Sequence, residues 1–420
     1  MQRADFSVKP DQPFDEEAGR HIRNLKLALG HVIESLPGER VTRPSELGNL
    51  LVLDTMLAWK IWKVINDDDP YDAALYAPGA NGMRQFLRAA RKRQASEDSL
   101  KAAQRAYDAF QVLIRSHAGD RKSFDMMLAG HVTADRARVD LEHRRGAFQH
   151  LSYVWGVQAR TQINTLFLRP SATPGYFDAA AIRGFVDLRR IRPNVPWRIA
   201  RCYTVDDAGA LQTAFVREPL DSTGATRTDG TDLPLLRDFC SQPLPECRRV
   251  DGPHGQVEYQ LVEGAVGNAG LLTCMTGEVI RAAEPYYRDA VHQELVLQAY
   301  ARTPCEMLLY DILVDRRLFP DFQPVLKVYS ALFLGDLDAK PAECDRIPLQ
   351  ETIAALGPGI DGLQTEEAPR YPEMIAYALQ RLAWNAADFD AYRVRLEFPP
   401  IPASVRIYHD LSEAPVGSHP

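Results

Sequence analysis

The segment RPSELGNLLVLDTMLAWKIWKVI, residues 43–65, has the pattern of two short helices joined by a tight turn. Pro44 and Glu46 are typical of the first turn of a helix, where proline is tolerated and a carboxylate meets the positive end of the helix dipole. Leu47 and Leu51 are four residues apart, so they would share one buried face. The sequence therefore predicts a first helix that begins at Pro44.

A second helix is expected directly after the first. Val52 and Leu53 would form the turn, and Asp54 would cap the new helix by accepting hydrogen bonds from its first N–H groups. Gly48 would be the small residue needed where the two helices cross. The core positions of the second helix would be Ala58, Ile61 and Ile65.

In this register the segment resembles the E-L-A-x-x-L-G-V-S-x-x-T-V-x-R pattern of bacterial helix-turn-helix regulators. The matching residues are Glu46, Leu47, Leu51, Leu53 and Lys60, with conservative replacements at Gly48, Asp54 and Ala58. Val52 stands where the family usually has glycine, and a β-branched residue makes a turn with positive φ costly. The resemblance implies an N-terminal DNA-binding region and a transcriptional regulator that acts by binding, without catalysis.

The resemblance also implies which side of the second helix would meet double-stranded DNA. That side carries Thr55, Met56, Trp59, Lys60 and Lys63. The lysines can bind phosphates, and Thr55 or Met56 can touch a thymine methyl group. The set lacks Arg, Asn and Gln, which form bidentate hydrogen bonds with base edges, so sequence reading would be poor or would rely on DNA shape.

A basic run in the next expected helix could flank the DNA backbone. It consists of Arg88, Arg91, Lys92 and Arg93. A solvated helix face is the alternative interpretation of this run. For the quoted segment the alternatives are a helical pair that binds another protein and a plain pair of core helices.

The chain has 420 residues, so two or three domains are expected. We predict a helical domain with the helix-turn-helix at 1–82, a helical extension at 83–152, and a mixed α+β domain at 153–420 that senses a ligand or forms an oligomer. The fold class would be α+β, with an all-α N-terminal region followed by a mixed α/β C-terminal domain.

Helical spacing dominates the first 150 residues. Besides the quoted pair, the expected helices cover residues 18–36, 72–75, 83–93, 96–115 and 133–153. From Val157 the apolar residues alternate, which is typical of strands. Strands are expected at 157–167, 197–205, 256–262, 271–280, 306–315 and 325–337, with a buried helix as the alternative for the last two. A loop is expected at 221–232, and helices at 282–301 and 372–386. Residues 393–398 and 404–411 would form a closing hairpin, with Arg393, Arg395 and Arg406 on its outer faces.

The net charge of −7 is unevenly distributed. Residues 1–170 hold 25 Lys+Arg against 21 Asp+Glu, whereas the remaining 250 hold 24 against 35. The slight excess of basic residues in 1–170 is consistent with an anionic partner that binds only the N-terminal part of the chain. Because one short helix gives little affinity, a homodimer on a palindromic DNA site is expected.

Other functional classes lack a signal in this sequence. No apolar run reaches the roughly 20 residues of a membrane span, and the acidic N-terminus does not resemble a secretory signal, so a cytoplasmic protein is expected. The six cysteines are dispersed and should be buried thiols. His143 and His150 share a helix face but lack a third metal ligand.

Nucleotide-binding, zinc-protease and hydrolase motifs are absent from the sequence, so no catalytic residue, metal or cofactor is expected. The alternatives to a regulator are a structural or assembly protein, such as a phage-related scaffold, and an enzyme of an unrecognised type. The effector of the C-terminal domain is unknown from the sequence.

Overall fold

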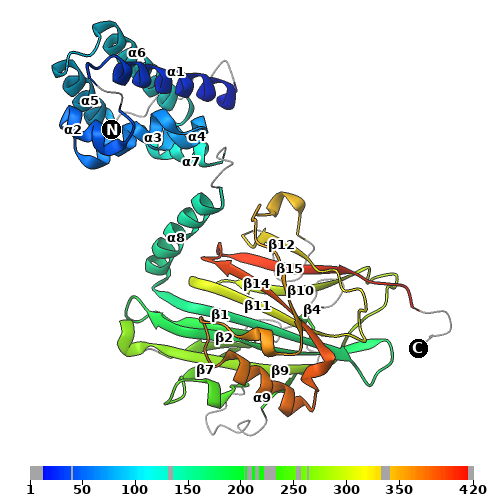
Figure 1. Cartoon of the computed structure of the whole chain (residues 1–420). Coiled ribbons are helices and arrows are strands. Elements are labelled where there is room, and N and C mark those ends of the chain that lie inside the picture. Colours follow the sequence, from blue (N-terminus) through cyan, green and yellow to red (C-terminus); the bar gives the residue numbers. More distant parts are fainter. Residues whose placement is uncertain are drawn as a thin grey trace. The chain divides into compact units, whose positions relative to one another are not determined.

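The computed structural model describes residues 13–38, 41–130, 136–202, 204–205, 211–212, 217–221, 233–251, 257–262, 264–332 and 341–414. The chain forms two compact units, Met1–Asp140 (the helical unit) and Leu141–Pro420 (the β unit). Helices occupy the described residues from 14 to 155, and strands dominate thereafter (Figure 1). The expected α+β fold, with a helical N-terminal region, is confirmed.

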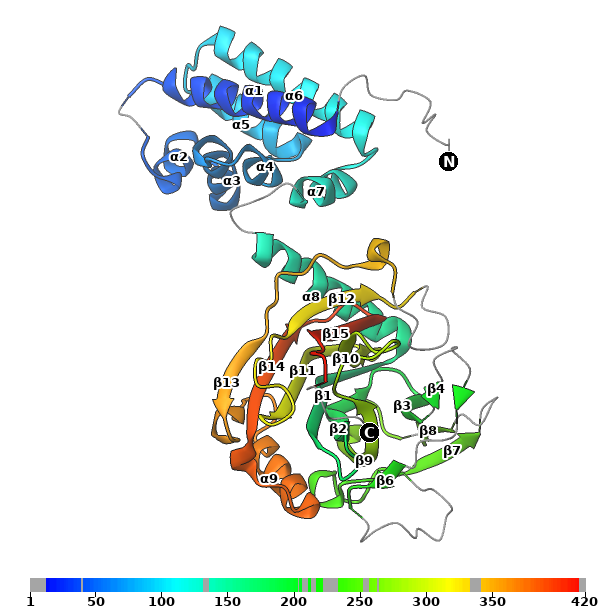
Figure 2. The same ribbon diagram turned by 90° about the vertical axis from the view of Figure 1, so that its right-hand side faces the viewer.

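The helical unit contains seven complete helices in its described residues. They are α1 (Phe14–Glu34), α2 (Pro44–Leu51), α3 (Thr55–Asn66), α4 (Pro70–Leu75), α5 (Ala80–Lys92), α6 (Glu97–His117) and α7 (Arg121–Ala129). Figure 2 shows α1 and α6 side by side, with α2, α3, α4 and α7 in a second row. An eighth helix, α8 (Arg136–Trp155), begins in the last residues of this unit and continues into the next.

One hydrophobic core joins the helices on both sides of residue 82. It contains Leu29 of α1, Leu47 of α2 and Ile61 of α3 together with Phe86 of α5 and Phe110 of α6, and each of these side chains is completely buried. Helices α5 to α7 therefore belong to the same compact unit as the α2–α3 pair. Helix α7 was not expected from the sequence.

The β unit is built on a seven-stranded sheet with the order β13-β14-β11-β1-β2-β9-β6. The strands in this order are Ala354–Pro358, Phe389–Glu397, Cys305–Asp315, Val157–Pro170, Tyr176–Arg190, Leu272–Pro285 and Arg217–Pro219. Strands β1 and β11 pair in parallel, and the other pairs are antiparallel.

Three smaller sheets complete the described strands. One has the order β10 (Glu294–Ala301), β15 (Ala403–Asp410), β12 (Val325–Ser330); another has the order β3 (Trp197–Cys202), β8 (Val257–Leu261), β7 (Cys247–Asp251); the third pairs β4 (Thr204–Val205) with β5 (Leu211–Gln212). Helix α9 spans Tyr371–Leu382.

Strand β1 contacts different elements on its two faces. Thr165 is hydrogen-bonded to Tyr371 of α9, with 2.7 Å between the two hydroxyl oxygens. The amide of Gln162 instead donates to the carbonyl of Tyr300 in β10, at 2.6 Å. Because alternate side chains of a strand point to opposite faces, α9 and β10 cover opposite faces of the large sheet.

The expected hairpin near the C-terminus is wrong. Strand β14 pairs with β11 and β13, whereas β15 pairs with β10 and β12. Three of the five connecting residues, 398–402, are prolines without a backbone N–H, so they cannot continue a hydrogen-bonded ladder between the two strands. Arg395 is exposed as expected, but Arg393 and Arg406 are buried. Arg393 is covered by the segment before α9, where it donates to the carbonyl of Leu363, and Arg406 lies in β15, whose side chains are buried on both faces.

The expected helix at 282–301 is also wrong. Strand β9 continues to Pro285, and residues 294–301 form β10, in which buried and less buried residues alternate strictly. Its residues ELVLQAYA favour a helix in isolation, but pairing with β15 buries every second side chain. The expected strand at 325–337 is shorter, at 325–330, and the expected loop at 221–232 lies almost entirely outside the described residues.

Strand β2 was not expected, and its glycine explains how it packs. A Cβ atom on Gly184 would lie 2.0 Å from the carbonyl oxygen of Cys274 and 2.8 Å from the sulfur of Met275, both in β9. The absence of a side chain at Gly184 therefore permits the close approach of the two strands.

We expect Gly184→Ala to lower the free energy of unfolding by about 2–3 kcal/mol, because the new methyl group displaces backbone. Gly146→Ala in α8 is the matched control, since a Cβ there meets no atom within 4 Å. Urea unfolding followed by circular dichroism measures both. Equal stability of the two variants would contradict the assigned packing of β2 on β9.

Candidate functional site

The α2–α3 pair has the geometry expected from the sequence. Leu47 and Leu51 are buried, and a Cβ on Gly48 would lie 3.4 Å from the Cβ of Ala58, so the helices cross closely at this glycine. Val52 has a φ of 53°, in the left-handed region that is costly for a β-branched residue. The carboxylate of Asp54 accepts hydrogen bonds from the N–H groups of Met56 at 2.9 Å and Leu57 at 3.3 Å. The two helices, the turn and the cap are therefore confirmed as structural elements.

The outer side of α3 is more apolar than its sequence match implies. Thr55 and Met56 are exposed, and Trp59 is 40% exposed and packs edge-on against Tyr76, with ring centroids 5.1 Å apart. Val52 in the turn is 81% exposed. Met56 and Trp59 are three residues apart on α3 and so share one side of the helix, and Val52 is exposed in the turn before it. We call these three residues the apolar ridge.

The two lysines of α3 have different surroundings. Lys60 is half-buried and has no ion-pair partner among the described residues. Lys63 binds two carboxylates: its ammonium nitrogen lies 2.5 Å from Asp67 and 3.3 Å from Asp72. Burial raises the pKa of Asp72, and the Asp67 carboxylate raises the pKa of Lys63. Lys63 therefore neutralises two acids within the fold, and DNA would have to compete with them.

The basic run of α5 is exposed but lies apart from α3. Arg88, Arg91, Lys92 and Arg93 are all exposed, and Arg91 donates to Glu97 at 2.8 Å. Helix α5 approaches α3 at its first turn, where a Cβ on Gly82 would lie 3.0 Å from Leu57. The basic run follows 6 to 11 residues later, about 9–16 Å along the helix axis. The expected DNA-contacting residues thus form two groups and not one cluster.

The charge of the helical unit is close to balanced. Residues 1–140 hold 21 Lys+Arg and 20 Asp+Glu. Most of the basic excess counted over 1–170 belongs to residues 141–170, in the β unit. Any attraction of this unit for an anion must come from local groups such as the α5 run.

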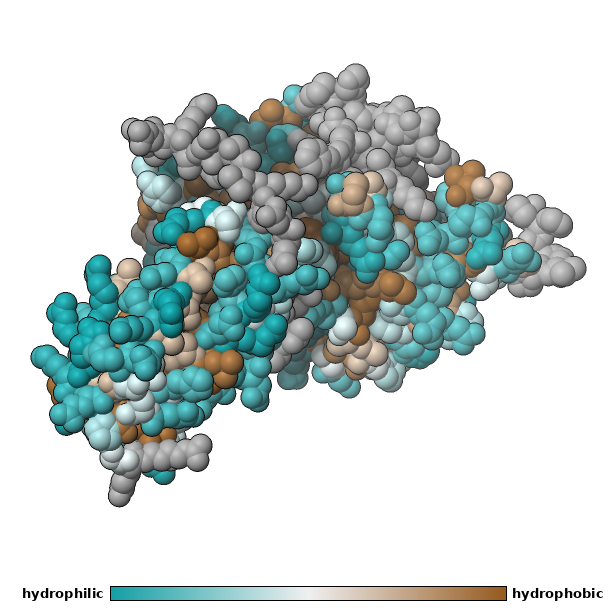
Figure 3. Space-filling view, turned by 90° about the horizontal axis from the view of Figure 1, so that it is seen from above, coloured by the Kyte–Doolittle hydropathy of each residue, from teal (hydrophilic) through white to brown (hydrophobic). Residues whose placement is uncertain are grey.

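The surface seen in Figure 3 is mostly hydrophilic, with hydrophobic side chains in small patches. Such isolated patches are ordinary for globular proteins. None of the helices in the part of the chain that the structure describes is long and apolar enough to cross a membrane.

The described thiols and histidines lie in no group that could hold a metal ion. His143 and His150 are exposed on α8, and no group of three His, Cys, Asp or Glu side chains among the described residues could hold a metal ion. Four cysteines are buried as expected: Cys240, Cys247, Cys274 and Cys305. Cys344 is exposed, contrary to expectation, because it lies in a short 3-10 turn outside the core.

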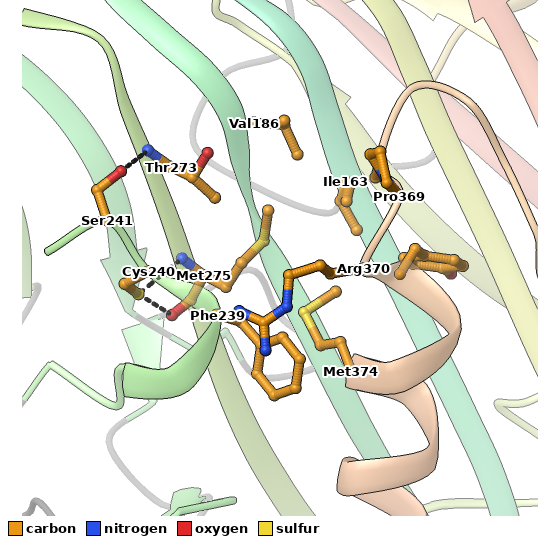
Figure 4. A pocket seen from close by; sticks show the side chains of 12 residues that line it. Ile163, Val186, Phe239, Cys240, Ser241, Thr273, Met275, Pro369, Arg370 and Met374 are labelled. Carbon is orange, nitrogen blue, oxygen red and sulfur yellow. Dashed lines mark hydrogen bonds between the residues drawn. The ribbon is translucent and has the colours of Figure 1, made fainter.

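A cavity of about 300 Å³ lies beside the N-terminus of α9, on the α9 face of the sheet. Figure 4 shows Met275, Met374, Phe239 and Ile163 around it. Its polar side chains already have partners. Arg370 donates to both carboxylate oxygens of Glu373 at 2.9 Å, and its guanidinium lies over Phe239. The Ser241 hydroxyl accepts from the N–H of Thr273 at 2.8 Å. This cavity has room for an apolar group but little that would orient a ligand.

A second cavity of about 320 Å³ has a polar lining, and we call it the polar cleft. It lies on the opposite face of the large sheet, between β1, β2 and β9 and strand β10. Charged and polar side chains gather in its lining: Gln162, Asn164, Arg183, Thr276, Glu278, Gln298 and Arg302. Apolar contacts come from Phe185, Ile199 and Leu233.

Strand register explains why these polar side chains meet. Asn164 of β1 lies opposite Arg183 of β2, and Arg183 lies opposite Thr276 of β9. On the other side Asn164 lies opposite Tyr310 of β11. A polar row thus crosses four neighbouring strands on one face of the sheet.

Arg183 forms two of the interactions in this row. The guanidinium of Arg183 donates to the side-chain oxygen of Asn164 at 3.1 Å and forms an ion pair with the buried carboxylate of Glu278. Three other polar atoms at this face are buried without a hydrogen-bond partner among the described residues: the Asn164 amide nitrogen, the Gln162 amide oxygen and the Tyr310 hydroxyl.

Comparisons with protein-family models, with curated proteins and with solved structures find no match to this chain.

No local pattern in the sequence predicted the polar cleft, because its residues come from strands far apart in the chain. Arg183 and Arg302 are 119 positions apart. Arg183 lies on β2 and Arg302 directly follows β10, and neither strand was expected from the sequence. The one available hint was the alternation of β1, which places Gln162 and Asn164 on the same side.

We expect Lys63→Met to lower the free energy of unfolding by about 1–3 kcal/mol, because it leaves two carboxylates without their cation. Lys60→Met, the matched control, should cost less than about 0.5 kcal/mol. The difference should shrink as the pH falls, because protonation of Asp72, whose pKa is raised, removes the unbalanced charge. Urea titrations at pH 7 and pH 4 measure it, and equal effects of both substitutions would show that Lys63 has no structural role.

Proposed function

We propose that this chain is a DNA-binding transcriptional regulator, in which α3 contacts double-stranded DNA and the β unit binds a small effector. The observation that carries the proposal is the α2–α3 arrangement, with its close crossing at Gly48, its left-handed turn at Val52 and its capped second helix, which has one exposed side. A helix presented in this way can enter a major groove. The activity would be binding alone, and a bacterial regulator of this kind would act in the cytoplasm.

The candidate contacts differ in strength. Thr55 and Met56, at the exposed N-terminal end of α3, would meet base edges, and Lys60 would meet a phosphate. Arg88, Lys92 and Arg93 are exposed and have no ion-pair partner among the described residues, so they are available to further phosphates. Lys63 and Arg91 are held by acids and would contribute less.

A homodimer follows from the same proposal. One short helix without Arg, Asn or Gln gives little specificity, and two copies one helical turn apart on a palindromic site would double the contacts.

The apolar ridge supports a second candidate function, in which the same helical pair binds protein. Methionine and tryptophan are enriched in the cores of protein interfaces, where charged residues are depleted. The exposed residues Val52, Met56 and Trp59 are apolar, so they suit contact with a protein better than contact with DNA phosphates. In this case the chain would be an assembly or scaffold protein.

The test of DNA binding is fluorescence anisotropy of labelled duplex DNA over a salt series. We expect Lys60→Ala/Arg88→Ala/Lys92→Ala/Arg93→Ala to weaken binding and to reduce the slope of log K against log salt by about 3 to 4, because each lost phosphate contact removes about 0.9. The matched control removes four exposed cations from α6 and α7: Lys101, Arg105, Arg115 and Lys122. It should leave the slope nearly unchanged.

Absence of binding at low salt, or equal losses in both quadruple variants, would contradict the DNA proposal. Light scattering on Met56→Ser/Trp59→Ser then tests the second candidate. A defined oligomer of the wild-type chain that this variant dissociates, with folding retained by circular dichroism, supports protein contacts through the apolar ridge. An unchanged mass would contradict self-assembly through that ridge.

A further inference from the structure

The polar cleft between β1, β2, β9 and β10 has the features of a small-molecule site. Its volume of about 320 Å³ lies at the lower end of the range of ligand pockets, roughly 300–1,000 Å³. Such pockets combine an apolar wall with a few converging polar groups. Phe185, Ile199 and Leu233 supply the wall, and Arg183, Arg302 and Asn164 supply polar groups.

The two arginines of the cleft have donors to spare. Arg183 uses its Nε and Nη1 atoms for Asn164 and Glu278, and its Nη2 has no acceptor among the described residues. Arg302 lies over the ring of Tyr300, with 4.1 Å between the guanidinium carbon and the ring centroid. Its guanidinium donates to no described residue. Stacking on Tyr300 fixes the cation and leaves its edge open to an anion.

The charges of the cleft indicate the charge of the ligand. The lining contains two arginines, Arg183 and Arg302, and one carboxylate, Glu278, so it carries one net positive charge. Arginine forks pair with planar carboxylates through two parallel hydrogen bonds. A ligand with a single carboxylate would therefore balance the cleft.

The unpartnered amides add a second requirement. Asn164 is 3% exposed, and its amide nitrogen has no acceptor, while the Gln162 oxygen two residues away on the same face has no donor. A buried polar atom left without a hydrogen bond costs about 1–3 kcal/mol. A ligand amide, with one donor and one acceptor, would satisfy the hydrogen-bonding capacity of both.

We propose that the polar cleft binds a small monocarboxylate that also carries an amide and an apolar side chain, the chemistry of an N-acylated amino acid. The carboxylate lies between Arg183 and Arg302, the amide faces Asn164 and Gln162, and the side chain packs on Phe185. This inference deepens the effector-binding role of the β unit proposed above. The ligand-binding test contains no DNA, so failure of the ligand proposal can be distinguished from failure of the DNA-binding proposal.

The test uses the full chain and two acids, N-acetyl-leucine and N-acetylphenylalanine, each compared with its uncharged primary amide. Saturation-transfer NMR at millimolar concentration detects binding, and titration gives the Kd. We expect both acids to bind at least about tenfold more tightly than their amides, because only the acids pair with the arginines. If neither acid binds, or if the amides bind equally well, the proposal is overturned.

Substitutions locate the binding in the cleft. Arg302→Gln should weaken acid binding at least about tenfold, whereas Arg288→Gln, an exposed arginine outside the lining, should leave it unchanged. Asn164→Asp keeps the oxygen that accepts from Arg183 but replaces the amide donor by a second oxygen. It should abolish acid binding through repulsion, with circular dichroism as the check of folding. Acid binding that survives both Arg302→Gln and Asn164→Asp would place the ligand elsewhere and overturn the assignment.

Discussion

The buried ion pair between Asp311 and Arg393 connects the main elements of the β unit. Asp311 lies on β11 and Arg393 on the neighbouring β14, and the guanidinium donates to the carboxylate at 2.7 and 2.9 Å. Burial raises the pKa of Asp311, and Arg393 opposes that shift. A charge this deep is tolerated only with a paired countercharge and satisfied hydrogen bonds.

The same pair holds the elements that cover one face of the sheet. The Tyr371 hydroxyl at the start of α9 donates to Asp311 at 2.8 Å, and Arg393 also donates to the carbonyl of Leu363 at 2.9 Å. Helix α9 and the segment before it are thus fixed by hydrogen bonds to two charged groups. On this face the polar groups satisfy one another, which suits a structural role.

On the opposite face of the same strands, several polar atoms lack hydrogen-bond partners among the described residues. One residue away along β1 and β11, Asn164 and Tyr310 carry polar atoms that no described residue satisfies, and Arg183 has donors left over. A strand alternates its side chains, so one sheet can present a closed polar network on one face and an open polar cleft on the other. This contrast is the physical basis for assigning ligand binding to the β10 side.

Local patterns in the sequence predicted the helices of the helical unit except α7. The α2–α3 pair, the cap at Asp54 and the strained turn at Val52 were all predicted, because capping, helical spacing and turn chemistry act between residues a few positions apart. Strands β1, β9 and β11 were predicted for the same reason, from runs of apolar or alternating residues.

The arrangement of the strands depends on contacts that form only in the folded chain. Residues 282–301 were expected to be helical from their composition, and Arg393 was expected to face solvent, yet pairing with distant strands overrode both local preferences. Lys63 was likewise predicted to be available for a DNA phosphate, but in the folded chain it forms an ion pair with Asp72. Local patterns thus predicted most of the helices and most of the strands, whereas the polar cleft, the pairing of charges and the order of the strands depend on contacts between residues far apart in the chain, which no local pattern specifies.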